Sequence, residues 1–94
     1  MSEPGNLCRE VTIQNNKGLH ARASALFVKC AERYDAEISV SRGGETVGGT
    51  SIMGLMMLAA AKGSTIVIEA KGAEAEQALQ ELISLVNEKF HEGS

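Results

Sequence analysis

The 94-residue sequence predicts an α+β fold: an open-faced β-sandwich in which three helices lie on one face of a four-stranded, mainly antiparallel sheet. Two observations lead to this fold class. Segments in which apolar and polar residues alternate are interleaved with segments rich in helix formers or with apolar residues at helical spacing, in the order β-α-β-β-α-β-α. Between the second and third strand segments lies a pair of glycines, which is typical of a tight hairpin and therefore of antiparallel pairing.

The first half of the chain is expected to form a strand, a helix and a hairpin. Residues 7–14 alternate apolar with polar side chains, as a half-buried strand does. Residues 21–34 are rich in alanine and other helix formers. Residues 36–41 alternate again, and the glycines within residues 42–45 predict a turn into a short strand at residues 46–47.

The second half predicts a capped helix, a strand and a long amphipathic helix. Ser51 precedes the apolar run 52–58 and is expected to be its N-cap, because a hydroxyl can accept hydrogen bonds from the first N–H groups of a helix. Residues 65–69 are rich in β-branched side chains and predict a central strand. The last helix has an apolar stripe formed by Ala75, Ala78, Leu79, Leu82, Ile83, Val86 and Phe90.

Composition indicates a folded protein and excludes several classes of function. Hydrophobic residues make up 44% of the chain, so we expect a single domain over residues 1–94 rather than a disordered chain. The net charge of −3 and the 3% aromatic content oppose nucleic-acid binding, which favours basic surfaces and stacking rings. The polar start has no apolar run, so we expect no signal peptide, no membrane insertion and a cytoplasmic location.

The ends and the cysteines are interpreted as ordinary features. Residues 1–6 and 91–94 are polar and are expected to be frayed, with His91 a surface side chain. Cys8 and Cys30 lie far apart and form no CxxC pair, which favours two free thiols over a disulfide or a zinc site.

The segment Gly18-Leu19-His20-Ala21-Arg22 joins the first strand to the first helix and is the best candidate for a functional site. It places His20 at the first turn of a helix, where unpaired N–H groups and the helix dipole favour an anion. The same positive end disfavours a charged imidazole, so the ring can act as a nucleophile. We predict that His20 carries a phosphoryl group, that Arg22 stabilises the charge of that group, and that Gly18 permits the turn before the ring.

The helix over residues 52–58 is apolar almost all round, and a short helix on a sheet cannot bury every side. Leu55 and Leu58 are expected in the core. We predict that one face of this helix is exposed near His20, where flexible thioethers can dock several partners in turn. The residues predicted for this docking surface are Ile52, Met53 and Met56.

Taken in order, these motifs resemble HPr, the histidine-containing phosphocarrier family of the bacterial phosphoenolpyruvate-dependent phosphotransferase system. Residues 18–22 are similar to its active-site loop, residues 50–56 to its regulatory-serine segment, and residues 61–64 to the turn into its last strand. The resemblance covers nearly the whole chain. One departure is Ala23, which stands where the family usually has proline and is expected to hold Arg22 less rigidly.

The resemblance implies a carrier rather than an enzyme, in which Nδ1 of His20 accepts a phosphoryl group from Enzyme I and passes it to an Enzyme IIA protein. It implies no metal or other cofactor, and we expect the carrier to be a monomer. Ser51 matches the serine that HPr kinase/phosphorylase modifies in many members, a role compatible with that of an N-cap. Sugar transport and a nitrogen-related regulatory branch both stay open, and the Ala23 variant together with the retained Ser51 segment favours the regulatory branch slightly.

Two interpretations from other classes are weighed against the carrier. One is a ferredoxin-like regulatory or ligand-binding module without phosphoryl transfer, in which His20 only caps a helix. The other is a corepressor-type relative that lacks transport function, although such a relative would normally lack the active histidine, which this sequence has.

Overall fold

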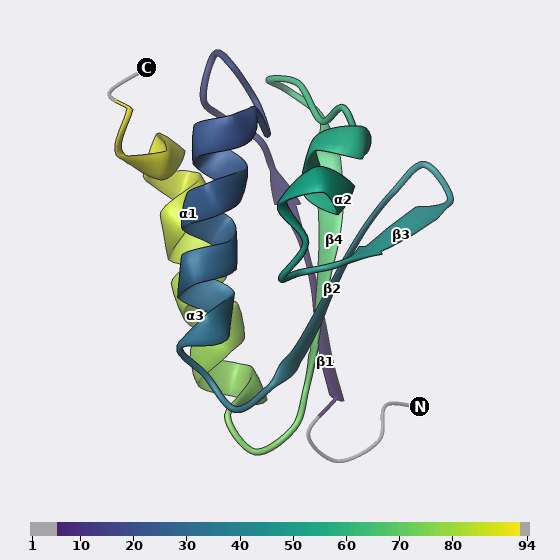
Figure 1. Ribbon diagram of the computed structural model, residues 1–94, viewed down its shortest axis with the longest axis vertical. Helices are drawn as coiled ribbons and strands as arrows, with labels where there is room; N and C mark the ends of the chain where they lie inside the picture. Colours follow the sequence, from purple (N-terminus) through teal and green to yellow (C-terminus); the bar gives the residue numbers. More distant parts are fainter. Residues whose placement is uncertain (1–5, 93–94) are drawn as a thin grey trace.

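The computed structural model describes residues 6–92 and confirms the predicted α+β sandwich (Figure 1). Its elements, in chain order, are β1 (Asn6–Thr12), α1 (Ala21–Glu32), β2 (Glu37–Arg42), β3 (Glu45–Gly48), α2 (Ile52–Met57), β4 (Thr65–Lys71), α3 (Ala75–Asn87) and the short 3-10 helix η1 (Lys89–His91). The predicted order of strands and helices is found, and η1 is added at its end.

The sheet has the strand order β1-β4-β2-β3, and all three neighbouring pairs are antiparallel. β4 lies between β1 and β2, which confirms the central position predicted from its β-branched residues. The β2–β3 hairpin is closed by Gly43 and Gly44, whose φ angles are +57° and +88°. Glycine adopts this left-handed conformation without steric cost, so the glycine pair explains the tight turn.

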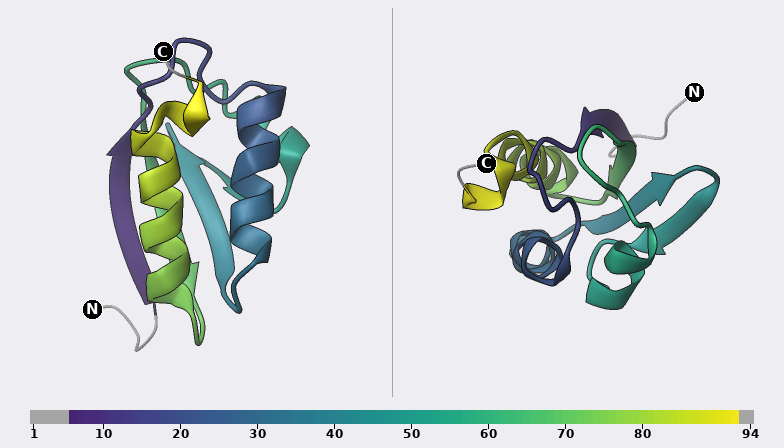
Figure 2. Two further views of the ribbon diagram at one scale, coloured as in Figure 1. Left: turned by 90° about the vertical axis from the view of Figure 1, so that its left-hand side faces the viewer. Right: turned by 90° about the horizontal axis from the view of Figure 1, so that it is seen from above.

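The helices lie on one face of the sheet and leave the other face open (Figure 2). α1 and α3 run side by side across that face, and α2 lies next to α1 (Figures 1 and 2). The core between helices and sheet contains the fully buried side chains of Phe27, Leu55, Ile66, Ile68, Leu82 and Phe90. Cys8 and Cys30 are free thiols, as predicted, the first exposed and the second buried.

The structure differs from the expected frayed ends at residues 1–6 and 91–94. Asn6 belongs to β1 and pairs with Lys71, and His91 belongs to η1. The apolar stripe of α3 does not continue as a helix to Phe90. Instead, Lys89, Phe90 and His91 have φ angles of +58°, +53° and +63°, and this turn returns Phe90 to the core, where it is fully buried. The buried ring of Phe90 holds the turn at residues 89–91, while the rest of the ends expected to be frayed, residues 1–5 and 93–94, lie outside the described part.

Candidate histidine site at the N-terminus of α1

His20 is the N-cap residue of α1, with an extended backbone (φ −76°, ψ −178°) and a carbonyl that accepts a hydrogen bond from Ser24 N at 2.9 Å. Its side chain makes no capping hydrogen bond and is 27% exposed. An N-cap side chain ordinarily carries an oxygen that accepts from the second or third N–H of the helix. The His20 ring makes no such bond, so its side chain does not satisfy the first-turn N–H groups of α1.

The loop before His20 is fixed against the segment that follows α2. Leu19 is 5% exposed, and its N–H donates to Ala60 O at 2.9 Å. Gly18 has a φ of +63°, and a Cβ built on it would lie 2.2 Å from that same oxygen. Only glycine fits this close approach, and Gly18 therefore sets the position of the ring as well as the turn before it.

Two residues that sequence reasoning missed complete the site. Asn15 is fully buried, and its Nδ2 donates to Gly18 O at 2.9 Å and to Glu92 Oε1 at 3.1 Å. The other carboxylate oxygen of Glu92, Oε2, contacts Nε2 of His20. Asn15 precedes a turn, which is a position where asparagine is common, and that signal was available. Nothing local points to Glu92, because it lies 72 residues from His20 and in a polar tail.

The charge of Glu92 follows from opposing effects. Burial raises its pKa, whereas hydrogen bonds from His20 and Asn15 and the positive charges of His20 and Lys17 lower it, and the net pKa lies below the ordinary value of 4.5. Glu92 is therefore an ionised acceptor at neutral pH. A carboxylate that faces Nε2 favours the ring form in which Nε2 carries the proton.

A pocket of ≈320 Å³ includes the ring in its lining, which consists of Asn16, Lys17, His20, Arg22, His91 and Glu92. Arg22 is exposed and, among the described residues, makes no side-chain hydrogen bond or ion pair. Ala23 behind it is fully buried. Two cationic side chains, Lys17 and Arg22, thus line the pocket and can interact with an anion, and the Glu92 carboxylate contacts the ring at Nε2.

The structure confirms the predicted cap of α2, its buried leucines and the exposure of its other predicted side chains. Ser51 is the N-cap, and its Oγ accepts from Gly54 N at 2.9 Å. Leu55 and Leu58 are buried. The exposed large apolar side chains of the described residues all belong to this helix, and they are Ile52 at 40%, Met53 at 73%, Met56 at 42% and Met57 at 68%. Met57 was not predicted to be exposed.

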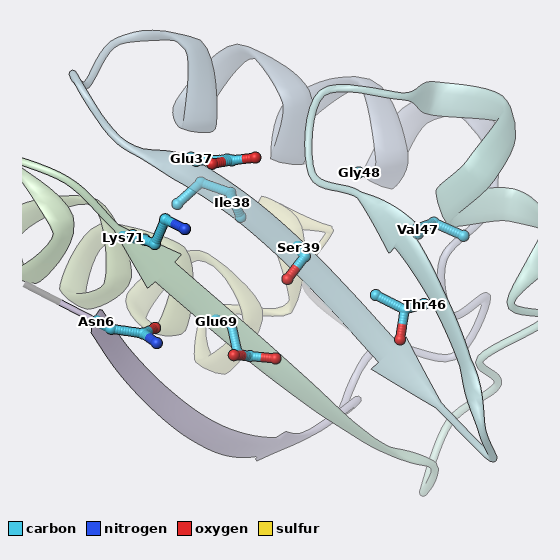
Figure 3. A pocket seen from close by; sticks show the side chains of 9 residues that line it. All are labelled: Asn6, Glu37, Ile38, Ser39, Thr46, Val47, Gly48, Glu69 and Lys71. Atoms are coloured by element: carbon cyan, nitrogen blue, oxygen red, sulfur yellow. The ribbon is translucent and has the colours of Figure 1, made fainter. Parts of the chain in front are cut away.

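A second pocket lies along the strands and is a weaker candidate for the functional site than the histidine pocket. Its lining includes Glu37, Ser39, Thr46, Glu69 and Lys71 (Figure 3). It contains no histidine or cysteine and none of the predicted site residues. Within residues 6–92 there is no group of side chains suited to hold a metal ion, and no helix is long and apolar enough to cross a bilayer.

Comparisons with known proteins match most of this chain. The family model described as "PTS HPr component phosphorylation site" matches residues 7–88. Phosphocarrier protein HPr of Pseudomonas aeruginosa is 47% identical over 85 residues, which cover 89% of this chain and 94% of that protein. Phosphocarrier protein NPr of Shewanella violacea is 42% identical over 86 residues, which cover 92% of this chain and 94% of that protein. The crystal structure of an HPr from Bacillus anthracis aligns with a TM-score of 0.83 at 42% identity, over 86% of this chain and 96% of that one.

Proposed function

This chain belongs to the HPr family of phosphocarrier proteins of the phosphotransferase system, and on that premise we propose that His20 is the residue that carries the phosphoryl group. The family role is that of a carrier rather than a catalyst, and it speaks against a ligand-binding module without phosphoryl transfer. The observation that carries the proposal is the His20 ring itself, partly exposed and placed as an N-cap that offers no oxygen to the helix.

The position of His20 is compatible with direct transfer of the phosphoryl group from Enzyme I to the ring. The lone pair of Nδ1 attacks phosphorus on phosphorylated Enzyme I, and the donor bond to phosphorus breaks with its electron pair returning to the donor. The phosphoryl oxygens then act as the hydrogen-bond acceptors that the N-cap side chain does not provide, because the first N–H groups of α1 can donate to them. Arg22 adds a guanidinium, and Enzyme IIA removes the group by the reverse step.

The test uses the two histidines of the chain as a matched pair. Wild type, His20→Ala and His91→Ala are incubated with Enzyme I and phosphoenolpyruvate, and acid-labile phosphate is counted. We expect wild type and His91→Ala to be labelled and His20→Ala to stay unlabelled. Labelling of His20→Ala at the wild-type level contradicts the assignment, as does a wild type that takes up no phosphate.

We propose that the exposed side chains of α2 form the surface on which Enzyme I and Enzyme IIA dock. This docking surface consists of Ile52, Met53 and Met56, and Met57 extends it. An apolar surface made largely of thioethers adapts to different partners, and a small contact allows fast release between transfers. We propose that the protein acts as a monomer, which analytical ultracentrifugation of the free chain checks.

Ser51 is proposed as a second, regulatory phosphorylation site. Its hydroxyl is exposed at the start of α2, next to the docking surface. A phosphate there keeps an acceptor for Gly54 N and adds about −1.5 to −2 charges, so it impedes docking without unfolding α2. Incubation with ATP and HPr kinase should modify wild type and not Ser51→Ala, and modification of both by mass spectrometry would reject this site.

The acceptor of the phosphoryl group decides between sugar transport and nitrogen-related regulation. Relatives named HPr and NPr both align over most of the chain, so the comparisons favour neither. We propose the regulatory branch, because the chain has Ala23 at the usual proline position and retains Ser51. Transfer from the labelled protein to a nitrogen-regulatory Enzyme IIA should then be faster than transfer to sugar-specific Enzyme IIA proteins, and the reverse order rejects the proposal.

A further inference from the structure

We propose that Glu92 is a positioning residue for His20: its carboxylate holds the ring proton on Nε2 and thereby leaves the lone pair on Nδ1 free for phosphorus. The inference rests on the proposed function, because it assigns Glu92 a part in the transfer at His20. It concerns the tautomer of the ring, which can be measured without any partner protein.

Both oxygens of the Glu92 carboxylate are held by the site. Oε2 contacts His20 Nε2, and Oε1 accepts from Asn15 Nδ2 at 3.1 Å. Asn15 is itself fully buried and anchored to Gly18 O at 2.9 Å. The carboxylate therefore cannot turn away from the ring without breaking a hydrogen bond to a buried amide. The Glu92 side chain is only 12% exposed, so water competes little for its oxygens.

The end of the chain is built to deliver Glu92 to this place. Three successive residues, Lys89 to His91, have φ angles between +53° and +63°, a conformation that side chains with a Cβ disfavour. Burial of Phe90 in the core stabilises this turn. A second tether joins Gln14 Nε2 to Asn87 Oδ1 at 3.2 Å, at the end of α3. A loose polar tail would need none of these features.

The chemistry of the transfer gives the carboxylate a purpose. When Nδ1 of a ring that is protonated on Nε2 forms a bond to phosphorus, the ring becomes a cation. Glu92 faces that cation across the Nε2–H bond and stabilises it. When the phosphoryl group leaves for the next acceptor, the electron pair returns to Nδ1 and the Nε2 proton stays in place. No proton has to enter or leave the site in either direction.

The spectroscopic test compares the His20–Glu92 pair with a second histidine–carboxylate pair, His91–Glu88. Glu88 Oε1 lies 3.4 Å from His91 Nδ1 and serves as the matched control. Ring ¹⁵N shifts are measured at about pH 8.5, roughly two units above the ordinary pKa of a free imidazole. We expect wild-type His20 to be the Nε2–H tautomer. Glu92→Ala should convert His20 to a mixture of tautomers and leave His91 unchanged, whereas Glu88→Ala should leave His20 unchanged.

The kinetic test separates positioning from folding and docking. With phosphorylated Enzyme I as donor, Glu92→Ala should lower kcat roughly 10-fold with little change in KM, because a hydrogen bond to a charged group is lost in the transfer. The kcat of Glu92→Gln, which keeps an oxygen acceptor without the charge, should lie between the kcat values of wild type and Glu92→Ala. An unchanged His20 tautomer in Glu92→Ala, or a kcat equal to that of Glu88→Ala, overturns the inference. If wild type takes up no phosphate, the proposed function fails while the ¹⁵N shifts still decide the role of Glu92.

Discussion

Replacing Gly18 with alanine tests whether the histidine loop is positioned by its contact with the segment after α2. A Cβ on Gly18 would lie 2.2 Å from Ala60 O and 2.9 Å from Ala61 Cα. Both atoms belong to the backbone, so no side chain can swing away to make room. The same Ala60 oxygen accepts the hydrogen bond from Leu19 N, and moving the two segments apart breaks that bond too.

The expected loss of stability has three parts. The left-handed φ of +63° costs an alanine about 1 kcal/mol more than a glycine. The lost hydrogen bond of Leu19 adds about 1 kcal/mol. Partial exposure of the Leu19 side chain, now 5% exposed, adds about 1 to 2 kcal/mol. We therefore expect Gly18→Ala to lower the free energy of unfolding by about 3 to 4 kcal/mol, or Tm by roughly 15 to 25 °C.

Gly43→Ala is the matched control for this experiment. Gly43 has a φ of +57°, but a Cβ built on it meets nothing within 4 Å, so the substitution carries the conformational penalty alone. We expect it to lower the free energy of unfolding by about 1 kcal/mol. Urea unfolding followed by circular dichroism measures both variants. If Gly18→Ala is no less stable than Gly43→Ala, the contact with Ala60 does not position the loop.

Three further predictions concern α2 and the end of the chain. Ser51→Ala removes the acceptor for Gly54 N and should lower the free energy of unfolding by about 1 kcal/mol in urea, whereas Ser51→Asp keeps a cap and should change it by less than about 0.5 kcal/mol. Leu55→Ala empties a fully buried position and should cost about 2.5 to 5 kcal/mol, while Met53→Ala, at 73% exposure, should leave stability within about 0.5 kcal/mol and raise the KM for Enzyme I. Because the pKa of Glu92 is lowered in the folded state, its ionised carboxylate should stabilise the fold fully above its ordinary pKa of 4.5, and this stabilisation should vanish as the pH falls through the folded pKa. The difference in unfolding free energy between wild type and Glu92→Gln should therefore shrink as the pH is lowered across this range. A difference that does not depend on pH would contradict the prediction.

Most of the fold could be predicted because its signals are local. The hairpin depends on Gly43 and Gly44, which adopt the left-handed turn without help from the rest of the chain. Ser51 caps α2 through a bond to a residue three positions away. The apolar stripe of α3 indicated which side of that helix is buried, and the β-branched residues of β4 indicated a central strand.

The part of the site that escaped prediction depends on contacts between distant segments. Glu92 reaches His20 only because the chain reverses at Lys89, Phe90 and His91, and lysine and phenylalanine do not favour positive φ. Their conformation is set by the tertiary burial of one side chain, Phe90, which no local propensity encodes. The clue in the sequence was that the apolar stripe extended to Phe90, past a run of polar residues.

Ala23 acquires a different meaning once the N-cap geometry is known. As a departure from the usual proline, it suggested only a looser hold on Arg22, whose side chain does lie exposed. But residue 23 is the third position of α1, and its N–H has no intrahelical partner. The third N–H of a helix is one of those that an N-cap side chain normally satisfies, and proline has none to offer. Alanine at this position therefore leaves the first turn of the helix a backbone N–H that proline would remove.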